Sequence, residues 1–338
     1  MAHARALHAR VHDVLAPALL PEPLTQPTDM QVFPPRRPDL FKRYKQAVAS
    51  FWVAEAIDLS ADAADYEKLS EGARHFVRHV LAFFAQVDVL VIDNTRCFWD
   101  EVTDQSAKLF YGFQVFMEGV HSEVYQQLIQ ALLKDEERAA TMRAIETMPV
   151  IAAKAAWVKK WMDPTLPFGV RVLAFAIVER VTFCAAFASI AWLRKQNVMP
   201  GLATANQYIA RDEGMHADFG VALLNDHVAN KPSAETAAAM LREAIAIEDA
   251  FVSESLPVRL LGMNCDEMQA YIRFVGDHLM TALKYRTLYG ATNPFPWMAD
   301  VTDGDSKGNF FEVKVTAYAI AGVGGDAASR VFATDADF

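Results

Sequence analysis

The chain has 338 residues, of which 53% are hydrophobic, and its formal net charge at pH 7 is −10. This composition can fill a large buried core, while the acidic charge without a long Lys/Arg run disfavours a nucleic-acid or anionic-membrane partner. The three cysteines, Cys97, Cys184 and Cys265, are far apart and form no CxxC pair. They argue against a disulfide framework and a zinc-thiolate site, and we expect a reducing, cytoplasmic compartment.

Residues 1–39 contain Arg and His but no long apolar segment, so a signal peptide is not expected, and a transit peptide is only weakly supported. We expect an extended N-terminal lead-in there, because QVFPPRRPDL is rich in proline. Residues 299–338 are rich in Gly, Ala and Asp and are expected to form a flexible tail.

Residues 40–298 are expected to form one all-α domain. Apolar residues recur at three- and four-residue spacing, and Pro- or Gly-containing breaks separate the periodic stretches. The expected helices lie near residues 41–50, 67–94, 104–133, 136–161, 170–196, 201–226, 233–256 and 265–288. No strand-like alternation and no internal repeat stands out.

The most apolar stretch, residues 173–193, carries Glu179 and Arg180 at its centre. A membrane-spanning helix would be strongly destabilised by these charges. A helix buried inside a soluble protein explains the stretch better, and Glu179 then needs a partner.

Two Glu-x-x-His pairs place a carboxylate and an imidazole on one helix face: Glu118 with His121, and Glu213 with His216. The pattern has a modest chance of arising at random. Both pairs nevertheless lie on long apolar helices, and no other His in the sequence has a Glu three residues before it.

Two more acids, Asp88 and Glu179, lie midway along apolar helices. The order along the sequence is therefore acid, Glu-x-x-His, acid, Glu-x-x-His, with gaps that suit antiparallel helix pairs. Ferritin-like di-iron and di-manganese proteins use this order with Glu at both single positions, so Asp88 is the one departure. We predict a ferritin-like helical bundle with a dinuclear metal site in its four-helix core.

The charges support this prediction. Four buried carboxylates without partners would be costly, whereas two divalent cations neutralise them. Oxygen ligands with two imidazoles suit iron or manganese better than structural zinc. The alternative is a set of ordinary buried ion pairs with residues such as Arg180 and Arg211.

Tyr125 follows His121 by four residues and therefore projects near the same face. Phe183 and Phe187 follow Glu179 at steps of four, and Ile209 precedes Glu213 by four. An apolar pocket around a phenol beside a metal pair is what a persistent tyrosyl radical requires. Without Tyr125, plain helix core would be the better explanation of these apolar residues.

The ordered set of segments resembles the small, radical-generating subunit of class I ribonucleotide reductase. The resemblance covers nearly the whole sequence and rests on FWVAEAIDLSADAADYEKLS, LAFFAQVDVLVIDN, FMEGVHSEVY, AFAIVERVTFCAAF, YIARDEGMH, NPFPWM, NFFE and the C-terminal TDADF. It implies an oxidoreductase subunit, ribonucleoside-diphosphate reductase, that works only with the large subunit in reducing ribonucleotides to deoxyribonucleotides.

The resemblance also implies roles for single residues. The six metal ligands would be Asp88, Glu118, His121, Glu179, Glu213 and His216. Tyr125 would bear the radical inside a cage of Phe183, Phe187 and Ile209. Trp52 and Asp212 would relay the electron and proton beside His121, and Tyr318 would pass the radical to the large subunit. The implied cofactor is a pair of iron ions, bridged by oxide when oxidised, with manganese as the alternative.

The implied partners are a second copy of this protein, through the helical domain, and the large subunit. The tail VFATDADF offers Phe332 and Phe338 as aromatic anchors for the large subunit. A di-metal ligand-binding oxidase of the same fold is the main alternative function, and an iron-storage protein is the next. Tyr125 and the TDADF ending argue against the oxidase, while the chain length, the tail and the Trp52 relay argue against iron storage.

Overall fold

The structure, a computed structural model, describes residues 19–28, 30–255 and 263–297. Within these ranges the regular elements are helices, and no strand is present. The C-terminal tail, including Tyr318, Phe332 and Phe338, and residues 1–18 and 29 of the N-terminal lead-in lie outside the described residues. The elements are α2 (Pro38–Ala49), η1 (Ala54–Ala56), α3 (Asp62–Lys68), α4 (Glu71–Glu101), α5 (Gln105–Leu132), α6 (Asp135–Thr141), α7 (Ala144–Thr147), α8 (Pro149–Trp161), α9 (Phe168–Ile177), η2 (Val178–Thr182), α10 (Cys184–Lys195), α11 (Pro200–Asp226), α12 (Ala234–Ser255) and α13 (Cys265–Ala282).

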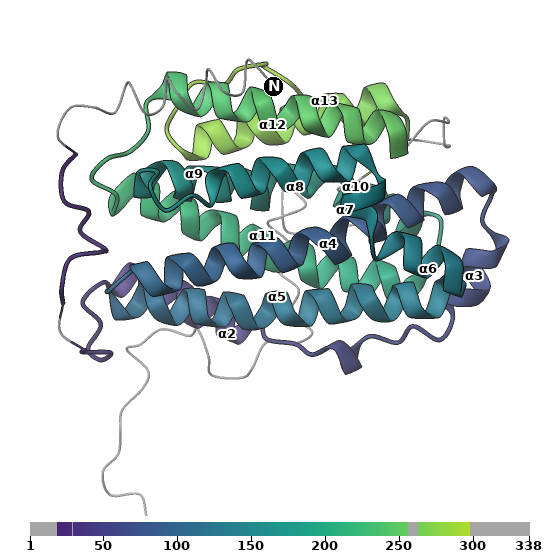
Figure 1. Ribbon diagram of the computed structural model, residues 1–338, viewed down its shortest axis with the longest axis horizontal. Coiled ribbons are helices and arrows are strands. Elements are labelled where there is room, and N and C mark those ends of the chain that lie inside the picture. The colour runs from purple at the N-terminus through teal and green to yellow at the C-terminus, as the bar shows by residue number, and fades with distance from the viewer. Residues whose placement is uncertain (1–18, 29, 256–262, 298–338) are drawn as a thin grey trace, which may run out of the picture.

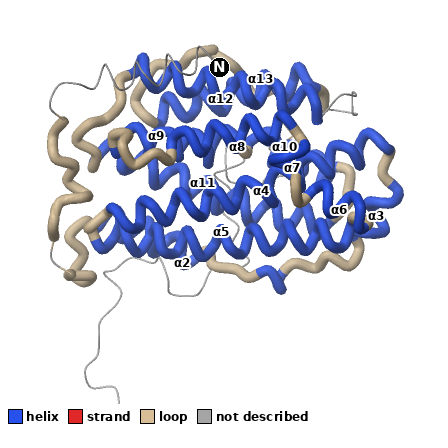
Figure 2. The backbone as a smooth tube through the Cα atoms, viewed as in Figure 1, coloured by secondary structure: helices blue, strands red, loops and turns tan. Residues whose placement is uncertain are grey.

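The long helices run roughly parallel or antiparallel in stacked layers (Figures 1 and 2). Helices α4 and α5 pack against each other, and α2 lies along the outer side of α5. Helix α11 packs on α9 and α10, which η2 joins, and these elements complete a four-helix core with α4 and α5. Helices α8, α12 and α13 cover the other side of the η2 region. The predicted ferritin-like helical fold is confirmed.

Local sequence signals set several helix ends. The hydroxyl of Ser70 accepts a hydrogen bond from the backbone N–H of Ala73 at the start of α4, and Asp104 caps α5 in the same way. Pro149 and Pro200 begin α8 and α11, where a missing N–H costs nothing. Each side-chain cap is worth about 1 kcal/mol and fixes where the ligand-bearing helices begin.

Four helix predictions need correction. The helix expected over 67–94 runs from Glu71 to Glu101, and the helix expected over 265–288 ends at Ala282. The other two predictions miss an interruption. The single helix expected over 136–161 is three short helices, α6, α7 and α8. Met148, with φ −117° and ψ 105°, is extended because it precedes Pro149, and this interrupts the helix. The helix expected over 170–196 is interrupted by η2, a turn of π-helix over Val178–Thr182. No proline or glycine marks this interruption in the sequence.

Helices α9 and α11 approach closely at Gly220. A Cβ at this position would lie 3.3 Å from the Cβ of Ala176 and 3.9 Å from a methyl of Val172. Two small residues facing each other therefore let α9, which leads into η2, pack tightly on α11. This contact draws together the segments that carry Glu179 and Glu213.

Two helical stretches, Glu71–Glu101 and Phe168–Lys195, are long and apolar enough to cross a membrane by length and composition. Their most apolar windows are 67% and 100% buried inside the protein. We therefore assign both to the core of a soluble helical protein, as predicted for residues 173–193.

Candidate metal centre

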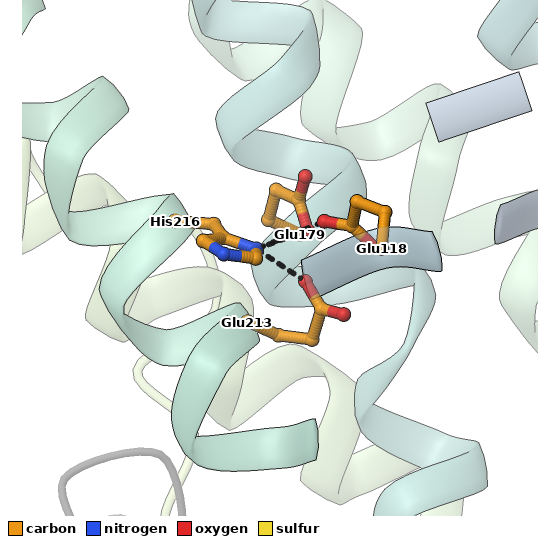
Figure 3. A group of neighbouring side chains, drawn as sticks. All are labelled: Glu118, Glu179, Glu213 and His216. Atoms are coloured by element: carbon orange, nitrogen blue, oxygen red, sulfur yellow. Dashed lines mark hydrogen bonds and ion pairs between the residues drawn. The ribbon is translucent and has the colours of Figure 1, made fainter. Parts of the chain in front are cut away.

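Four buried side chains from three elements converge at the middle of the bundle (Figure 3). Glu118 comes from α5, Glu179 from η2, and Glu213 and His216 from α11. One potential ligand atom from each lies within 4.8 Å of the others, so the group could hold a metal ion. None of the four side chains is more than 3% exposed.

The two imidazoles stand on either side of shared carboxylates. His216 Nδ1 lies 3.0 Å from an oxygen of Glu118 and 3.0 Å from an oxygen of Glu213. His121 Nδ1 lies 3.3 Å from the other oxygen of Glu118 and 3.1 Å from the other oxygen of Glu213. Glu118 and Glu213 therefore each face both histidines, which is the arrangement that bridging carboxylates between two ions would need.

Asp88, on α4, is 2% exposed, and its Oδ2 has no hydrogen-bond partner. Burial raises the pKa of Asp88 well above its usual value, and the negative charges of Glu118 and Glu213 raise it further. The Asp88 carboxylate therefore lies close enough to Glu118 and Glu213 for their charges to affect its pKa. It lies outside the group of four that could share one ion.

Glu179 is fully buried and is placed by the π-turn η2. Gln114, one turn before Glu118 on α5, donates a hydrogen bond from Nε2 to Glu179 Oε1 at 3.1 Å. Glu179 Oε2 has no hydrogen-bond partner and lies 4.0 Å from His216 Nδ1. An amide that holds one carboxylate oxygen leaves the other available for a cation.

The protonation of the group shows an excess of buried negative charge. Burial raises the pKa of Glu179 well above its usual value, and the charge of Glu213 adds to this effect. Burial opposes protonation of His216, but the carboxylates of Glu118 and Glu213 raise its pKa to about 9. Burial also opposes protonation of His121, but the carboxylates of Asp212, Glu118 and Glu213 raise its pKa well above its usual value.

The buried negative charge therefore favours positive charge at this position, whether protons or cations supply it. Several buried atoms also have no hydrogen-bond partner, namely Asp88 Oδ2, Glu118 Oε1 and Oε2, His121 Nδ1 and Glu179 Oε2. Such atoms are costly unless something binds them. Carboxylates and imidazoles are suitable ligands for iron or manganese, so the residues present fit a dinuclear centre.

The two arginines considered as partners in the ion-pair alternative contact other acids. Arg180 pairs with Asp218 on α11, and Arg211 pairs with the neighbouring Asp212 at 2.9 Å. Asp218 is half exposed, so the Arg180 pair faces outward from the bundle. Neither of these two ion pairs includes Glu118, Glu179 or Glu213.

Trp52, Asp212 and His121 form a hydrogen-bonded row beside the cluster. The indole Nε1 of Trp52 donates to Asp212 Oδ2 at 2.7 Å, and the same oxygen lies 3.2 Å from His121 Nε2. The Trp52 and His121 rings lie stacked with centroids 5.9 Å apart. Burial alone would raise the pKa of Asp212, but the charge of Arg211 and the contact with His121 hold it below its usual value.

Tyr125 is fully buried, and its hydroxyl has no hydrogen-bond partner. Burial raises the pKa of the phenol well above its usual value, and the charge of Asp88 raises it further. The ring of Tyr125 stacks on Phe84 with centroids 4.3 Å apart and an interplanar angle of 2°. The phenol is therefore neutral, shielded from solvent and near enough to the carboxylates for their charges to affect its pKa.

The predicted cage residues Phe183 and Phe187 contact this same Phe84, with ring centroids 5.8 Å and 5.2 Å away. Ile209 is buried on α11 in the same hydrophobic core. Sequence reasoning missed Phe84, although it precedes Asp88 by four residues, the same spacing that singled out Phe183. It also missed Gln114, four residues before Glu118.

The sequence matches a family model. The model described as "Ribonucleotide reductase, small chain" matches residues 29–294. A ribonucleoside-diphosphate reductase small chain from Spisula solidissima is 46% identical over 325 residues, which are 94% of this chain and 84% of the relative. A second ribonucleoside-diphosphate reductase small chain, from Arabidopsis thaliana, is 44% identical over 333 residues, 95% of this chain and 100% of the relative.

Solved structures agree with these relatives. The Rnr4 homodimer structure from Saccharomyces cerevisiae superposes with a TM-score of 0.75 at 32% identity, covering 87% of this chain and 92% of that chain. The dimanganese(II)-NrdF structure from Streptococcus sanguinis, at 15% identity, shares the fold with a TM-score of 0.69 over 82% of this chain and 99% of that chain. The chain therefore belongs to the ribonucleotide reductase small-chain family, the small subunits of the oxidoreductase ribonucleoside-diphosphate reductase.

Proposed function

We propose that this protein uses a pair of metal ions to oxidise Tyr125 to a stored tyrosyl radical. The oxidising equivalent then passes to the large subunit, which reduces ribonucleotides for DNA precursor synthesis. The observation that carries the proposal is the fully buried, partnerless phenol of Tyr125 beside a cluster of buried carboxylates and imidazoles. Family membership supports the same conclusion.

The ions would be held by six residues. These are Asp88, Glu118, His121, Glu179, Glu213 and His216. When bound, the metal pair supplies the oxidising power, with molecular oxygen as the oxidant. Iron is our first choice and manganese the alternative. Both metals take oxygen and imidazole ligands, so the ligand set suits either. Glu118 and Glu213, which each face both histidines, are suited to bridge the ions.

Tyr125 must release a proton together with its electron, because its phenol is neutral at working pH. After burial itself, the charge of Asp88 is the largest influence that raises the pKa of the phenol, so the proton must leave Tyr125 beside this carboxylate's charge. Phe84, which stacks on the Tyr125 ring, and Phe183 and Phe187, which pack on Phe84, would exclude water and reductants from the phenol. This exclusion would let the radical persist.

The row Trp52–Asp212–His121 offers a route out of the centre. Asp212 accepts the indole N–H of Trp52 and fixes the orientation of His121 through its other ring nitrogen. In our proposal the electron and proton move along this row, and Tyr318 in the C-terminal segment carries the radical to the large subunit. That segment, residues 299–338, would also dock the large subunit.

A homodimer is the proposed assembly of the small subunit. Helices α4 and α5 pair with each other and expose three large apolar side chains, Val89, Trp99 and Phe116. Phe116 is 53% exposed and contacts the ring of Phe51. Exposed apolar side chains on paired helices suit a two-fold contact with a second copy. We propose the cytoplasm as the location.

The deciding experiment is to load the metal-free protein with Fe(II), admit oxygen and record the EPR spectrum beside that of Tyr125→Phe. A tyrosyl signal in the wild type that is absent from the variant would support the proposal. Tyr111, which is also fully buried, supplies the matched control, because Tyr111→Phe should retain the signal. Full iron uptake without a radical would oppose iron as the native metal. If manganese with a dedicated oxidant also gave none, a two-electron ligand-binding oxidase would be the better assignment.

A further inference from the structure

A second set of buried charges lies on the outer side of the bundle core. Lys154 on α8 is 2% exposed and Glu248 on α12 is fully buried. Their side chains meet with Nζ to Oε1 at 2.6 Å. The ammonium of Lys154 also lies over the rings of Phe83 and Phe251, with centroids 3.5 Å and 4.2 Å away. The proposed chemistry does not use this pair.

A buried ion pair is a weak explanation of stability. Removing two charges from water is costly, and well-packed apolar residues of similar volume often stabilise a protein as well or better. Lys154 makes one further contact that an apolar residue could not make. Its Nζ donates a hydrogen bond to the backbone carbonyl of Thr182 at 2.8 Å.

Thr182 is the last residue of η2, the π-turn that carries Glu179. A π-turn interrupts the regular backbone hydrogen bonding of a helix, so its geometry depends on added contacts. Inside the helix, the hydroxyl of Thr182 bonds to the carbonyl of Val178 at 2.8 Å. From outside, Lys154 holds the carbonyl of Thr182, while Gln114 holds Glu179 itself on the inner side.

We propose that Lys154, held by Glu248, is a positioning residue for the metal centre. Its ammonium fixes the Thr182 carbonyl and so keeps the π-turn in the form that directs Glu179 toward the ions. An ammonium suits this role because a charged donor makes a stronger bond to a carbonyl than a neutral one does. This inference rests on the proposed metal centre, but not on radical formation.

The test is a titration of the metal-free protein with Mn(II), in which EPR of free Mn(II) gives stoichiometry and affinity without any activity assay. We expect Lys154→Met/Glu248→Leu to fold, with a thermal midpoint within a few degrees of the wild type, because it removes both buried charges. One Mn(II) per protomer should bind roughly 10–100-fold more weakly, the usual cost of losing a residue that supports a ligand. Glu248→Gln retains the Lys154 donor and a neutral acceptor for it but removes the charge partner, so it should weaken binding less than the double variant does.

The matched control is an outer ion pair between the same two helices. Lys160 on α8 meets Glu243 on α12 at 2.8 Å, and both side chains are partly exposed. Lys160→Met/Glu243→Gln should leave Mn(II) binding unchanged, because the hydrogen bonds of this pair are to each other and to Trp157 rather than to η2. Lys154→Gln/Glu248→Gln, measured in parallel, covers the case in which the apolar variant does not fold, with the same weakening expected.

Unchanged binding of both ions in the folded Lys154 variants would overturn the positioning role. An equal loss in the Lys160 control would also overturn it, because general loosening between α8 and α12 would then explain the effect. A wild-type protein that bound no Mn(II) and no Fe(II) would overturn the metal centre itself, and this inference with it. The two failures are therefore distinguishable.

Discussion

Trp52 donates its indole N–H to Asp212 across 2.7 Å, although the two residues are 160 positions apart in the sequence. The bond lies wholly inside the protein, and the same carboxylate oxygen faces His121. A tryptophan at the edge of the bundle is thereby connected to the carboxylate cluster at its centre through one shared oxygen.

The first prediction concerns this connection. Trp52→Phe should lower ribonucleotide reduction with the large subunit at least 100-fold, because no other atom of residue 52 can replace the indole N–H. Metal uptake should be retained. The measurement is turnover of the mixed subunits at saturating large subunit.

Trp157 supplies the matched control, since its indole also donates to a carboxylate, Glu243, at 3.1 Å and the side chain is also buried. Trp157→Phe should destabilise the fold comparably and leave turnover within about threefold. Equal losses in both variants would argue for a general packing effect.

The second prediction concerns Phe84. Phe84→Leu should shorten the lifetime of the Tyr125 radical at least tenfold, because it removes the ring stacked on the phenol and opens space for water. The initial radical yield should change little. The decay of the EPR signal after oxygen exposure measures this lifetime.

Phe98, which stacks on Tyr111 with centroids 5.6 Å apart, is the comparison residue. Either substitution should cost roughly 1–3 kcal/mol of folding stability. Phe98→Leu should leave the radical lifetime unchanged, and a similar shortening in both would contradict a specific role for Phe84.

The third prediction concerns metal removal. Because the buried carboxylates repel one another, saturating Mn(II) or Fe(II) should raise the thermal midpoint of the metal-free protein. An ion at 100 times its dissociation constant adds about 2.7 kcal/mol per site. Glu118→Gln should abolish most of this gain, since Glu118 faces both His121 and His216.

Glu123→Gln changes an exposed residue of the same helix and should keep the full metal-induced gain. Differential scanning calorimetry with and without metal gives the metal-induced rise in thermal midpoint for each variant. A full gain in Glu118→Gln would remove Glu118 from the ligand set.

The fourth prediction is a pH dependence away from the metal centre. Burial lowers the pKa of His79 from 6.5 to about 4, so the folded protein resists protonating this imidazole while the unfolded protein does not. Stability from neutral His79 is fully present above pH 6.5 and is lost as the pH falls toward 4. Between pH 7 and 5 this single group removes up to about 2 kcal/mol.

His79→Gln should therefore lose up to about 2 kcal/mol less stability than the wild type over that range. Urea unfolding of both proteins at pH 7 and pH 5 measures the difference. Parallel pH profiles would show that His79 can be protonated without loss of the fold.

The fifth prediction concerns the partner. A synthetic peptide of residues 331–338, VFATDADF, should compete with the small subunit for the large subunit and inhibit turnover. The same residues in scrambled order should not. Full activity at a saturating dose of the native peptide would contradict docking through the C-terminus.

The sequence alone determined the elements of the metal centre that depend on helix geometry. A Glu and a His three residues apart share a face in any helix, so Glu118 with His121 and Glu213 with His216 could be paired before any fold was known. The apolar periodicity predicted the long helices. The order of the acids and Glu-x-x-His pairs along them predicted the ferritin-like bundle, because the gaps between them suit antiparallel helix pairs.

Tertiary structure decided the contacts between residues far apart in the sequence. Gln114 on Glu179, Phe84 on Tyr125 and Lys154 on the Thr182 carbonyl all cross between helices, and periodicity carries no information about such crossings. The π-turn that places Glu179 was likewise not predictable from the sequence pattern. No proline or glycine in Val178–Thr182 marks it, and the contacts made to it, from Lys154 and Gln114, come from other helices.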